Sequence, residues 1–129
     1  MKFNKLIPEL SVSNIEKSRE FYLMLGFKIK YERKNDKFIF LERDGCQLMI
    51  QEHNDNWNTG ELEYPYGRGI NISMEITDVE GLYNLIVKIN YTVFSEIIYN
   101  EYETDGKTFI DKEFLVQDPD GYLLRFNEE

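Results

Sequence analysis

The sequence predicts an α+β protein made of two copies of one βαβββ unit. Two observations lead to this fold class. First, the run at 12–16 matches the run at 76–80, a shift of 64 residues (76 − 12 = 64). Second, each matched run is followed by a helical stripe of apolar residues and then by strand-like segments. Several correspondences share one shift and one order of elements, so we expect a duplicated unit.

Each predicted helix carries one apolar face. The residues of these faces are Ile15, Ser18, Tyr22 and Leu25 in the first copy and Val79, Leu82, Ile86 and Ile89 in the second. Asn14 and Asp78 can accept hydrogen bonds at a helix N-terminus. Gly26 and Asn90 stand where a helix would end in a left-handed residue, and they keep the shift of 64 (90 − 26 = 64).

Strand-like segments follow both helices, at 28–32, 38–41 and 47–51 in the first copy and at 91–94, 109–117 and 122–126 in the second. Turn-forming residues separate them at 34–36, 44–45 and 118–121. Gly45 and Gly121 are 76 residues apart (121 − 45 = 76), which implies 12 extra residues in the second copy (76 − 64 = 12). The polar stretch 100–107 is the simplest place for them. Within a single domain, 1–129, we assign 1–56 to the first unit, 57–68 to a linker and 69–129 to the second unit.

Composition and charge limit the partners of the chain. Its net charge of −9 disfavours nucleic acids and anionic membranes, whereas a positively charged small molecule would be attracted. The single cysteine, Cys46, excludes an internal disulfide and suits a reducing compartment. No segment approaches the roughly 20 apolar residues of a membrane span, and the N-terminal residues show no signal-peptide pattern. We therefore expect a cytoplasmic protein.

Three motifs carry a family resemblance. An opening strand and helix are recognised at 7–14 and 16–22, ending in "FY" and followed by "LGF" at 25–27. A "DPDG" turn opens a closing hairpin at 118–126, and a linker-like stretch lies at 60–69. In this order the chain resembles the glyoxalase/bleomycin-resistance/dioxygenase (vicinal-oxygen-chelate) superfamily, and within it the bleomycin-resistance-protein-like branch. The resemblance implies the glyoxalase/bleomycin-resistance fold, with curved mixed sheets around a cleft, and a homodimer.

The resemblance also indicates where a metal would bind. In metal enzymes of the superfamily, four side chains converge on a divalent ion that polarises a substrate oxygen. These positions fall on Ile7 and Asn71 in the opening strands and on Met49 and Arg125 in the closing strands. Ile7 has no donor atom, Met49 offers only a thioether, and Arg125 is a permanent cation. The one histidine, His53, lies off these positions, so we expect no metal, no cofactor and no catalytic residue.

Two other hypotheses stay open. A shift of two residues along the strands would turn Glu9, Gln47 or Gln51 inward, and a metal-dependent glyoxalase, dioxygenase or thiol transferase with shifted ligands would then be the alternative. A regulatory or immunity-type module that binds an endogenous metabolite is the third possibility. Elemental analysis of the purified protein separates the enzyme from the two binding modules.

Aromatic residues indicate what such a cleft could bind. Phe38 and Phe40 alternate on one strand, so their rings share a face. Trp57, the only tryptophan, lies in a polar loop and either stacks on a ligand or anchors the loop. The predicted ligand-binding residues are Phe38, Phe40, Met49, Trp57, Asn71, Tyr102 and Arg125. The expected function is metal-independent binding of the bleomycin-resistance type, in which an aromatic, acidic cleft sequesters a small molecule such as a cationic glycopeptide antibiotic.

Arg125 needs a partner if its side chain faces inward, because an unpaired buried charge is very costly. One possible partner is a carboxylate such as Glu9 or Glu75. The other is an anionic group on the ligand, in which case the ligand is not a simple cation.

Overall fold

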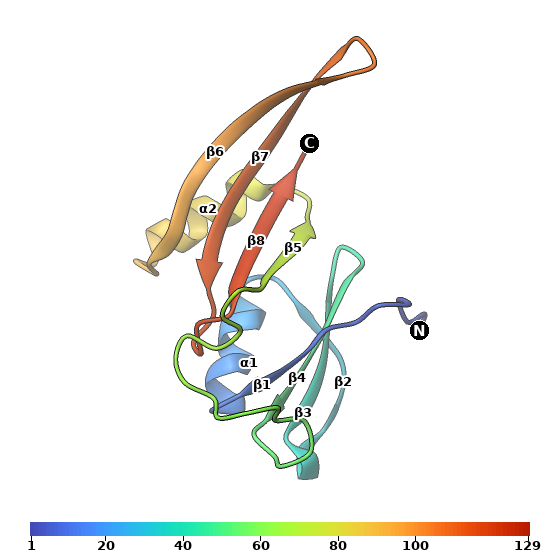
Figure 1. Cartoon of the computed structure of the whole chain (residues 1–129), viewed down its shortest axis with the longest axis vertical. Coiled ribbons are helices and arrows are strands. Elements are labelled where there is room, and N and C mark those ends of the chain that lie inside the picture. Colours follow the sequence, from blue (N-terminus) through green and yellow to red (C-terminus); the bar gives the residue numbers. More distant parts are fainter. The chain divides into compact units, whose positions relative to one another are not determined.

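The computed structural model describes the whole chain, Met1–Glu129. The chain divides into two compact units, Met1–Tyr66 and Gly67–Glu129, each with one α-helix and one four-stranded sheet (Figure 1). The division falls inside the stretch 57–68.

The first unit has the element order of a βαβββ unit. Its elements are β1 (Glu9–Val12), α1 (Ile15–Met24), β2 (Lys28–Arg33), the short 3-10 helix η1 (Lys34–Asp36), β3 (Phe38–Arg43) and β4 (Cys46–Glu52). The strand order in the sheet is β1-β4-β3-β2. β1 runs parallel to β4, whereas the other neighbours are antiparallel, so the sheet is mixed.

The second unit repeats this arrangement with β5 (Asn71–Glu75), α2 (Val79–Lys88), β6 (Val93–Thr104), β7 (Lys107–Gln117) and β8 (Leu123–Glu128). Its strand order is β5-β8-β7-β6, and β5 is parallel to β8. The two sheets correspond strand by strand, which confirms the predicted α+β fold of two βαβββ units. Neither of the two ten-residue helices is long and apolar enough to cross a membrane.

The core of the first unit lies between α1 and one face of its sheet. Register places Leu10 of β1 beside Ile50 of β4, and Ile50 opposite Ile39 of β3, so these side chains share a face. All three are buried, and α1 contacts β3 and β4. Full burial of one such aliphatic side chain contributes about 1.5–3 kcal/mol. Because side chains alternate along a strand, the residues between them point to the opposite face.

The helix faces follow the predicted stripes with one exception. Ile15, Ser18, Tyr22 and Leu25 are buried in the first unit, and Val79, Leu82 and Ile86 are buried in the second. Ile89 was expected to complete the second stripe, and this prediction is wrong, because its side chain is exposed. Ile89 is the C-cap residue of α2, as Leu25 is of α1, so the two copies differ in burial at an equivalent position.

A carboxylate at the end of each sheet caps the helix of the same unit. Glu52, the last residue of β4, accepts a hydrogen bond from the backbone N–H of Ile15 (3.0 Å). Glu128, at the end of β8, accepts from the N–H groups of Asp78 (3.0 Å) and Val79 (3.1 Å). The two glutamates are 76 residues apart (128 − 52 = 76), the separation of the turn glycines. A free helix N-terminus favours a nearby negative charge, so the duplicated unit includes this cap.

The extra residues of the second unit lengthen a hairpin. β6 and β7 have 12 and 11 residues, whereas their counterparts β2 and β3 have 6 each. The tip is the pair Asp105 (φ 53°) and Gly106 (φ 73°), the backbone of a tight two-residue hairpin turn. The predicted strand 91–94 therefore began two residues early and ended ten residues too soon. Residues 95–104 are mostly exposed, so they carry no burial pattern, and backbone pairing with β7 extends the strand.

Candidate functional site

Three aromatic rings form a row on the sheet of the first unit, on the face opposite the aliphatic core. Phe38 and Phe40 come from β3, and Tyr31 of β2 pairs with Phe40. The rings of Tyr31 and Phe40 are stacked, with centroids 5.2 Å apart and an interplanar angle of 13°. The Tyr31 and Phe38 centroids are 5.9 Å apart. We call these three rings the aromatic face.

A guanidinium group lies over one end of the aromatic face. The Cζ atom of Arg33 is 4.0 Å from the ring centroid of Phe38 and 6.0 Å from that of Tyr31. A planar cation is attracted to the negative face of an aromatic ring. Arg33 also forms an ion pair with Asp36 (3.4 Å).

The two phenylalanines of the aromatic face have little free surface. Phe38 is 3% exposed and Phe40 is 1% exposed. Arg33 covers Phe38, and the ring of Phe3 packs edge-on against Phe40, with centroids 5.4 Å apart. A ligand on this side therefore meets the covering side chains first.

Trp57 is anchored to the same side of the sheet. Its indole Nε1–H donates to the Oε1 atom of Gln51 on β4 (3.3 Å), and Gln51 lies opposite Phe38 in the β3–β4 ladder. Gln51 also donates to the backbone carbonyl of Asp36 (3.2 Å). The Trp57 side chain is 61% exposed, so one amide fixes a large ring that stays open to solvent.

Met49 also lies on this side, because it is opposite Phe40 on β3 and beside Glu9 on β1. Its side chain is partly exposed. Ile7 precedes β1 and is partly buried. His53 follows β4 directly and stacks on Tyr66, with ring centroids 5.5 Å apart.

Arg125 of the second unit pairs with a carboxylate that sequence reasoning did not consider. Its Nε atom donates to Oε1 of Glu113, which lies on the neighbouring strand β7. The side chain of Glu113 is 9% exposed, whereas that of Arg125 is 43% exposed. Arg125 therefore has a carboxylate partner, as expected for an inward-facing arginine, but the partner is Glu113 rather than Glu9 or Glu75. The glutamate is the buried partner and the arginine neutralises it from the solvent side.

Further acidic and aromatic groups lie near this ion pair. Asp111 is two residues before Glu113 on β7, so both point to one face. Burial, and then the negative charge of Glu113, raise the pKa of Asp111. Tyr102 of β6 stacks on Phe109 of β7, with centroids 5.9 Å apart, and burial followed by nearby carboxylates raises its pKa. The remaining predicted residue, Asn71, is exposed at the start of β5.

The four positions expected to bind a metal in the superfamily do not fit a divalent cation. Hard and borderline cations take carboxylate, imidazole or thiolate ligands. Met49 offers a thioether, Asn71 a neutral amide, and Ile7 has no donor. Arg125 is positively charged, which disfavours a cation, and it forms an ion pair with Glu113. Nowhere in Met1–Glu129 do three or more His, Cys, Asp or Glu side chains gather in a group that could hold a metal.

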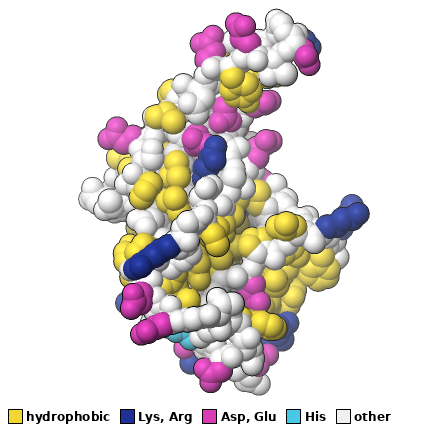
Figure 2. All heavy atoms as spheres, in the orientation of Figure 1, with side chains coloured by type: hydrophobic (Ala, Val, Ile, Leu, Met, Phe, Trp, Pro, Cys, Tyr) yellow, Lys and Arg dark blue, Asp and Glu magenta, His cyan; other side chains and the backbone are white.

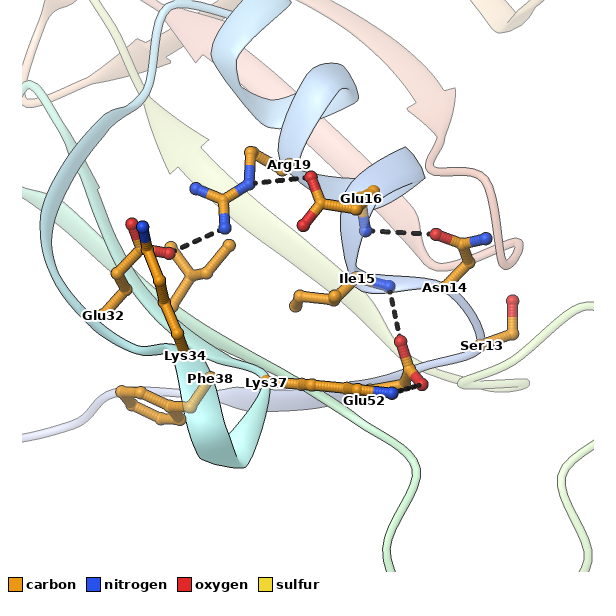
Figure 3. Close-up of a pocket in the computed structure, with 11 residues that line it drawn as sticks. Ser13, Asn14, Ile15, Glu16, Arg19, Glu32, Lys34, Lys37, Phe38 and Glu52 are labelled. Atoms are coloured by element: carbon orange, nitrogen blue, oxygen red, sulfur yellow. Dashed lines mark hydrogen bonds and ion pairs between the residues drawn. The ribbon is translucent and has the colours of Figure 1, made fainter.

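A cavity of about 600 Å³ lies at the N-terminus of α1 (Figure 3). Its charged groups bind one another: Arg19 donates to Glu32 (2.7 Å) and Glu16 (3.2 Å), and Lys37 donates to Glu52 (3.1 Å). The Arg19 hydrogen bond lowers the pKa of Glu32, and the Ile15 N–H lowers that of Glu52. Of the predicted ligand-binding residues, only Phe38 lines this cavity. We therefore place the candidate site on the aromatic face.

Solved structures of known proteins resemble this chain. A glyoxalase/bleomycin resistance protein/dioxygenase superfamily member from Vibrio splendidus 12B01 is 32% identical over 94% of this chain and 95% of that chain. Its TM-score of 0.47 is low, so the sequence identity alone carries the comparison. The chain belongs to the glyoxalase/bleomycin resistance protein/dioxygenase superfamily. No protein-family model matches the chain, and no curated protein matches it either.

Two more members or relatives show the fold of this superfamily. A glyoxalase/bleomycin resistance protein/dioxygenase from Alicyclobacillus acidocaldarius is 21% identical over 97% of this chain and 90% of that chain, with a TM-score of 0.65. A bleomycin-binding protein complexed with bleomycin is 20% identical over 98% of this chain and 99% of that chain, with a TM-score of 0.64. The superfamily resemblance and fold expected from the sequence are thereby confirmed.

Sequence reasoning missed several residues of the site. Tyr31, Arg33 and Phe3 were not considered, and Gln51 entered only as a possible shifted metal ligand. The alternation of Tyr31 and Arg33 along β2, next to Phe38 and Phe40 on β3, was a usable signal once a β2–β3 hairpin was expected. Phe3 gave no signal, because it lies outside every strand.

Proposed function

We propose that the chain binds a small organic cation with a planar ring and holds it without changing it chemically. The contact of Arg33 with Phe38 carries this proposal. At 4.0 Å, the guanidinium lies where a planar cation gains most from an aromatic ring. The ring of Phe38 therefore has the preference for a positive charge that a cationic guest requires.

Trp57 supports the same function. Its ring is large, exposed and hydrogen-bonded to Gln51 at the end of β4, near Phe38. A fixed aromatic ring loses little conformational freedom when a flat molecule stacks on it. Trp57 is thus suited to bind the outer side of the guest.

The charge of the second unit favours a cation too. Its β6–β7 hairpin carries acidic side chains at Glu96, Glu101, Glu103, Asp105, Asp111 and Glu113 and two lysines, Lys107 and Lys112 (Figure 2). The hairpin therefore has a formal charge of −4 (2 − 6 = −4). A net negative charge on a protein attracts positively charged molecules to it.

The side chains at the expected metal-ligand positions support binding without a chemical reaction. A guanidinium, a thioether and a hydrocarbon side chain stand at positions where metal enzymes of the superfamily need ligands, so none of them can hold the divalent ion that polarises a substrate oxygen in those enzymes. The likeness in fold to a bleomycin-binding protein makes bleomycin the first compound to test.

Fluorescence titration of the purified protein tests this function, because Trp57 is the only tryptophan. We expect saturable quenching by metal-free bleomycin at micromolar concentrations, a stoichiometry near one per chain, and recovery of the compound with unchanged mass. EDTA should leave the affinity unaltered. Absence of saturation, or a changed mass of the recovered compound, would contradict the proposal.

Two further properties belong to this proposal. A homodimer is supported by exposed apolar side chains on β6 and β7, among them Phe94, Ile98 and Ile110, and sedimentation at micromolar concentration tests it. A cytoplasmic location is supported by the cysteine content, because the single cysteine, Cys46, cannot form an internal disulfide. Fractionation of cells that express the chain tests that location.

A further inference from the structure

Residues 2–4 belong to no strand, yet they are tied to the sheet of the first unit. Gln47 of β4 holds them on both sides of Phe3. Its Oε1 atom accepts from the backbone N–H of Asn4 (2.7 Å), and its Nε2 atom donates to the carbonyl of Lys2 (2.7 Å). The side chain of Asn4 donates to the carbonyl of Gly45 (2.8 Å). These three hydrogen bonds fix the backbone from which the Phe3 ring extends.

Phe3 is the outermost ring above Phe40. The two rings meet nearly perpendicularly, at 85°, which is a favoured geometry for an aromatic pair. Phe40 has 1% of its surface exposed, whereas Phe3 has 52% exposed. A molecule that approaches the aromatic face at this end therefore touches Phe3 rather than Phe40.

Gln47 is itself rigidly held. It is buried, and its Nε2 atom also donates to Glu42 on β3 (2.8 Å), directly opposite in the ladder. This bond is the main reason that the pKa of Glu42 lies below its usual range. Because a charged acceptor and two backbone groups fix the amide, it has one orientation, and so has the segment it holds.

We infer that Phe3 is a ligand-contacting residue of the aromatic face and that Gln47 is its positioning residue. This inference rests on the proposed function of the same face. The ligand stacks its planar ring on the exposed side of Phe3, while its cationic part lies toward Phe38. Gln47 makes no contact with the ligand and acts only by fixing the backbone on both sides of Phe3.

Calorimetric titration of bleomycin into Phe3→Ala, Phe3→Tyr and Leu6→Ala tests the contact. We expect Phe3→Ala to weaken binding about fivefold, in the range of one aromatic pair, and Phe3→Tyr to bind like the wild type. Leu6 is more exposed than Phe3 and lies in the same segment, so Leu6→Ala is the matched control and should bind normally. Unchanged or tighter binding by Phe3→Ala would show that the ring only packs on Phe40 or competes with the ligand.

A double-mutant cycle tests the positioning role. Gln47→Leu should weaken binding by about as much as Phe3→Ala, and the double variant should bind no more weakly than either single variant. A purely structural role of Gln47 would instead make the two losses add. If Gln47→Leu fails to unfold cooperatively in urea, the comparison of Phe3→Ala with Phe3→Tyr decides the inference.

The titrations distinguish a failure of the proposed function from a failure of the role of Phe3 alone. If the wild-type chain shows no saturable heat, the proposed function fails and the role of Phe3 fails with it. If the wild type binds bleomycin and Phe3→Ala binds it equally well, only this inference fails.

Discussion

The guanidinium of Arg33 lies 4.0 Å above the ring of Phe38, and the two residues are paired across the β2–β3 ladder. A side chain of the protein thus takes the place that a cationic ligand would need. Arg33 is half exposed and comes from the edge strand of its sheet, so it can leave the ring without disturbing the core.

Replacement of Arg33 by alanine should strengthen the binding of a planar cation. The ligand would no longer compete with the guanidinium, and an exposed contact of this kind is worth about 0.5–1 kcal/mol, or about two- to fivefold in affinity. Calorimetric titration with bleomycin measures the effect. Arg33→Lys keeps the charge and should bind like the wild type. Weaker binding by Arg33→Ala would show that Arg33 supports the ligand, and equal binding would show that the ligand does not compete with Arg33 for the ring of Phe38.

Replacement of Gln51 by alanine should free the indole of Trp57. The variant loses the hydrogen bond that fixes the ring, which is worth about 1 kcal/mol, so affinity for bleomycin should fall about fivefold. Calorimetry is the proper measurement, because the fluorescence of Trp57 changes with its surroundings. Asn54→Ala alters the same loop without touching Gln51 and should leave the affinity intact. Normal binding by Gln51→Ala would mean that the ligand does not use a fixed Trp57.

Replacement of Arg125 by methionine should destabilise the protein. Glu113 would stay buried without its cation, and we expect a loss of about 1–2 kcal/mol in the free energy of unfolding, a moderate figure because Arg125 is partly exposed. Urea unfolding measures this loss, and adding Glu113→Leu should recover most of it. The more exposed pair Lys112–Glu80 is the control, and Lys112→Met should change stability little. A stable Arg125→Met variant would show that Glu113 needs no partner.

Replacement of Glu52 by glutamine should lower stability in a pH-dependent way. The hydrogen bond from Ile15, and then Lys37, hold the pKa of Glu52 below its usual range. The stabilisation is therefore present above the unfolded pKa of about 4.3 and is lost as pH falls through the lower folded pKa. Unfolding at neutral pH should show a deficit of about 1 kcal/mol that vanishes in acid.

The exposed carboxylate Asp55 provides the comparison for Glu52. Asp55→Asn should leave the stability of the protein unchanged at every pH. A deficit of Glu52→Gln that persists at acidic pH would show that the charge of Glu52 does not stabilise α1.

The fold could be predicted from the sequence because its signals are local and repeated. Asn14, Gly26, Asp78 and Asn90 adopt the cap and left-handed conformations expected of them, since those conformations depend on a few neighbouring atoms. The length of β6 could not be read in this way. Its outer half is exposed on both faces, so only its pairing with β7 shows that it is a strand.

The site was less predictable because its contacts join residues far apart in the sequence. The shared face of Phe38 and Phe40 followed from strand alternation alone. The partner of Arg125 did not follow, because Glu113 is reached diagonally across a ladder whose register is invisible in the sequence. Phe3 needs Gln47, which is 44 residues away (47 − 3 = 44), to bring it to the sheet.

A crystal structure of the protein with bleomycin bound would test the central claim most directly. The account predicts a planar ring of the compound against Trp57 or Phe3, a cationic group over Phe38, and Arg33 moved off that ring. Bleomycin bound in the cavity at the N-terminus of α1, with Arg33 still over Phe38, would contradict it.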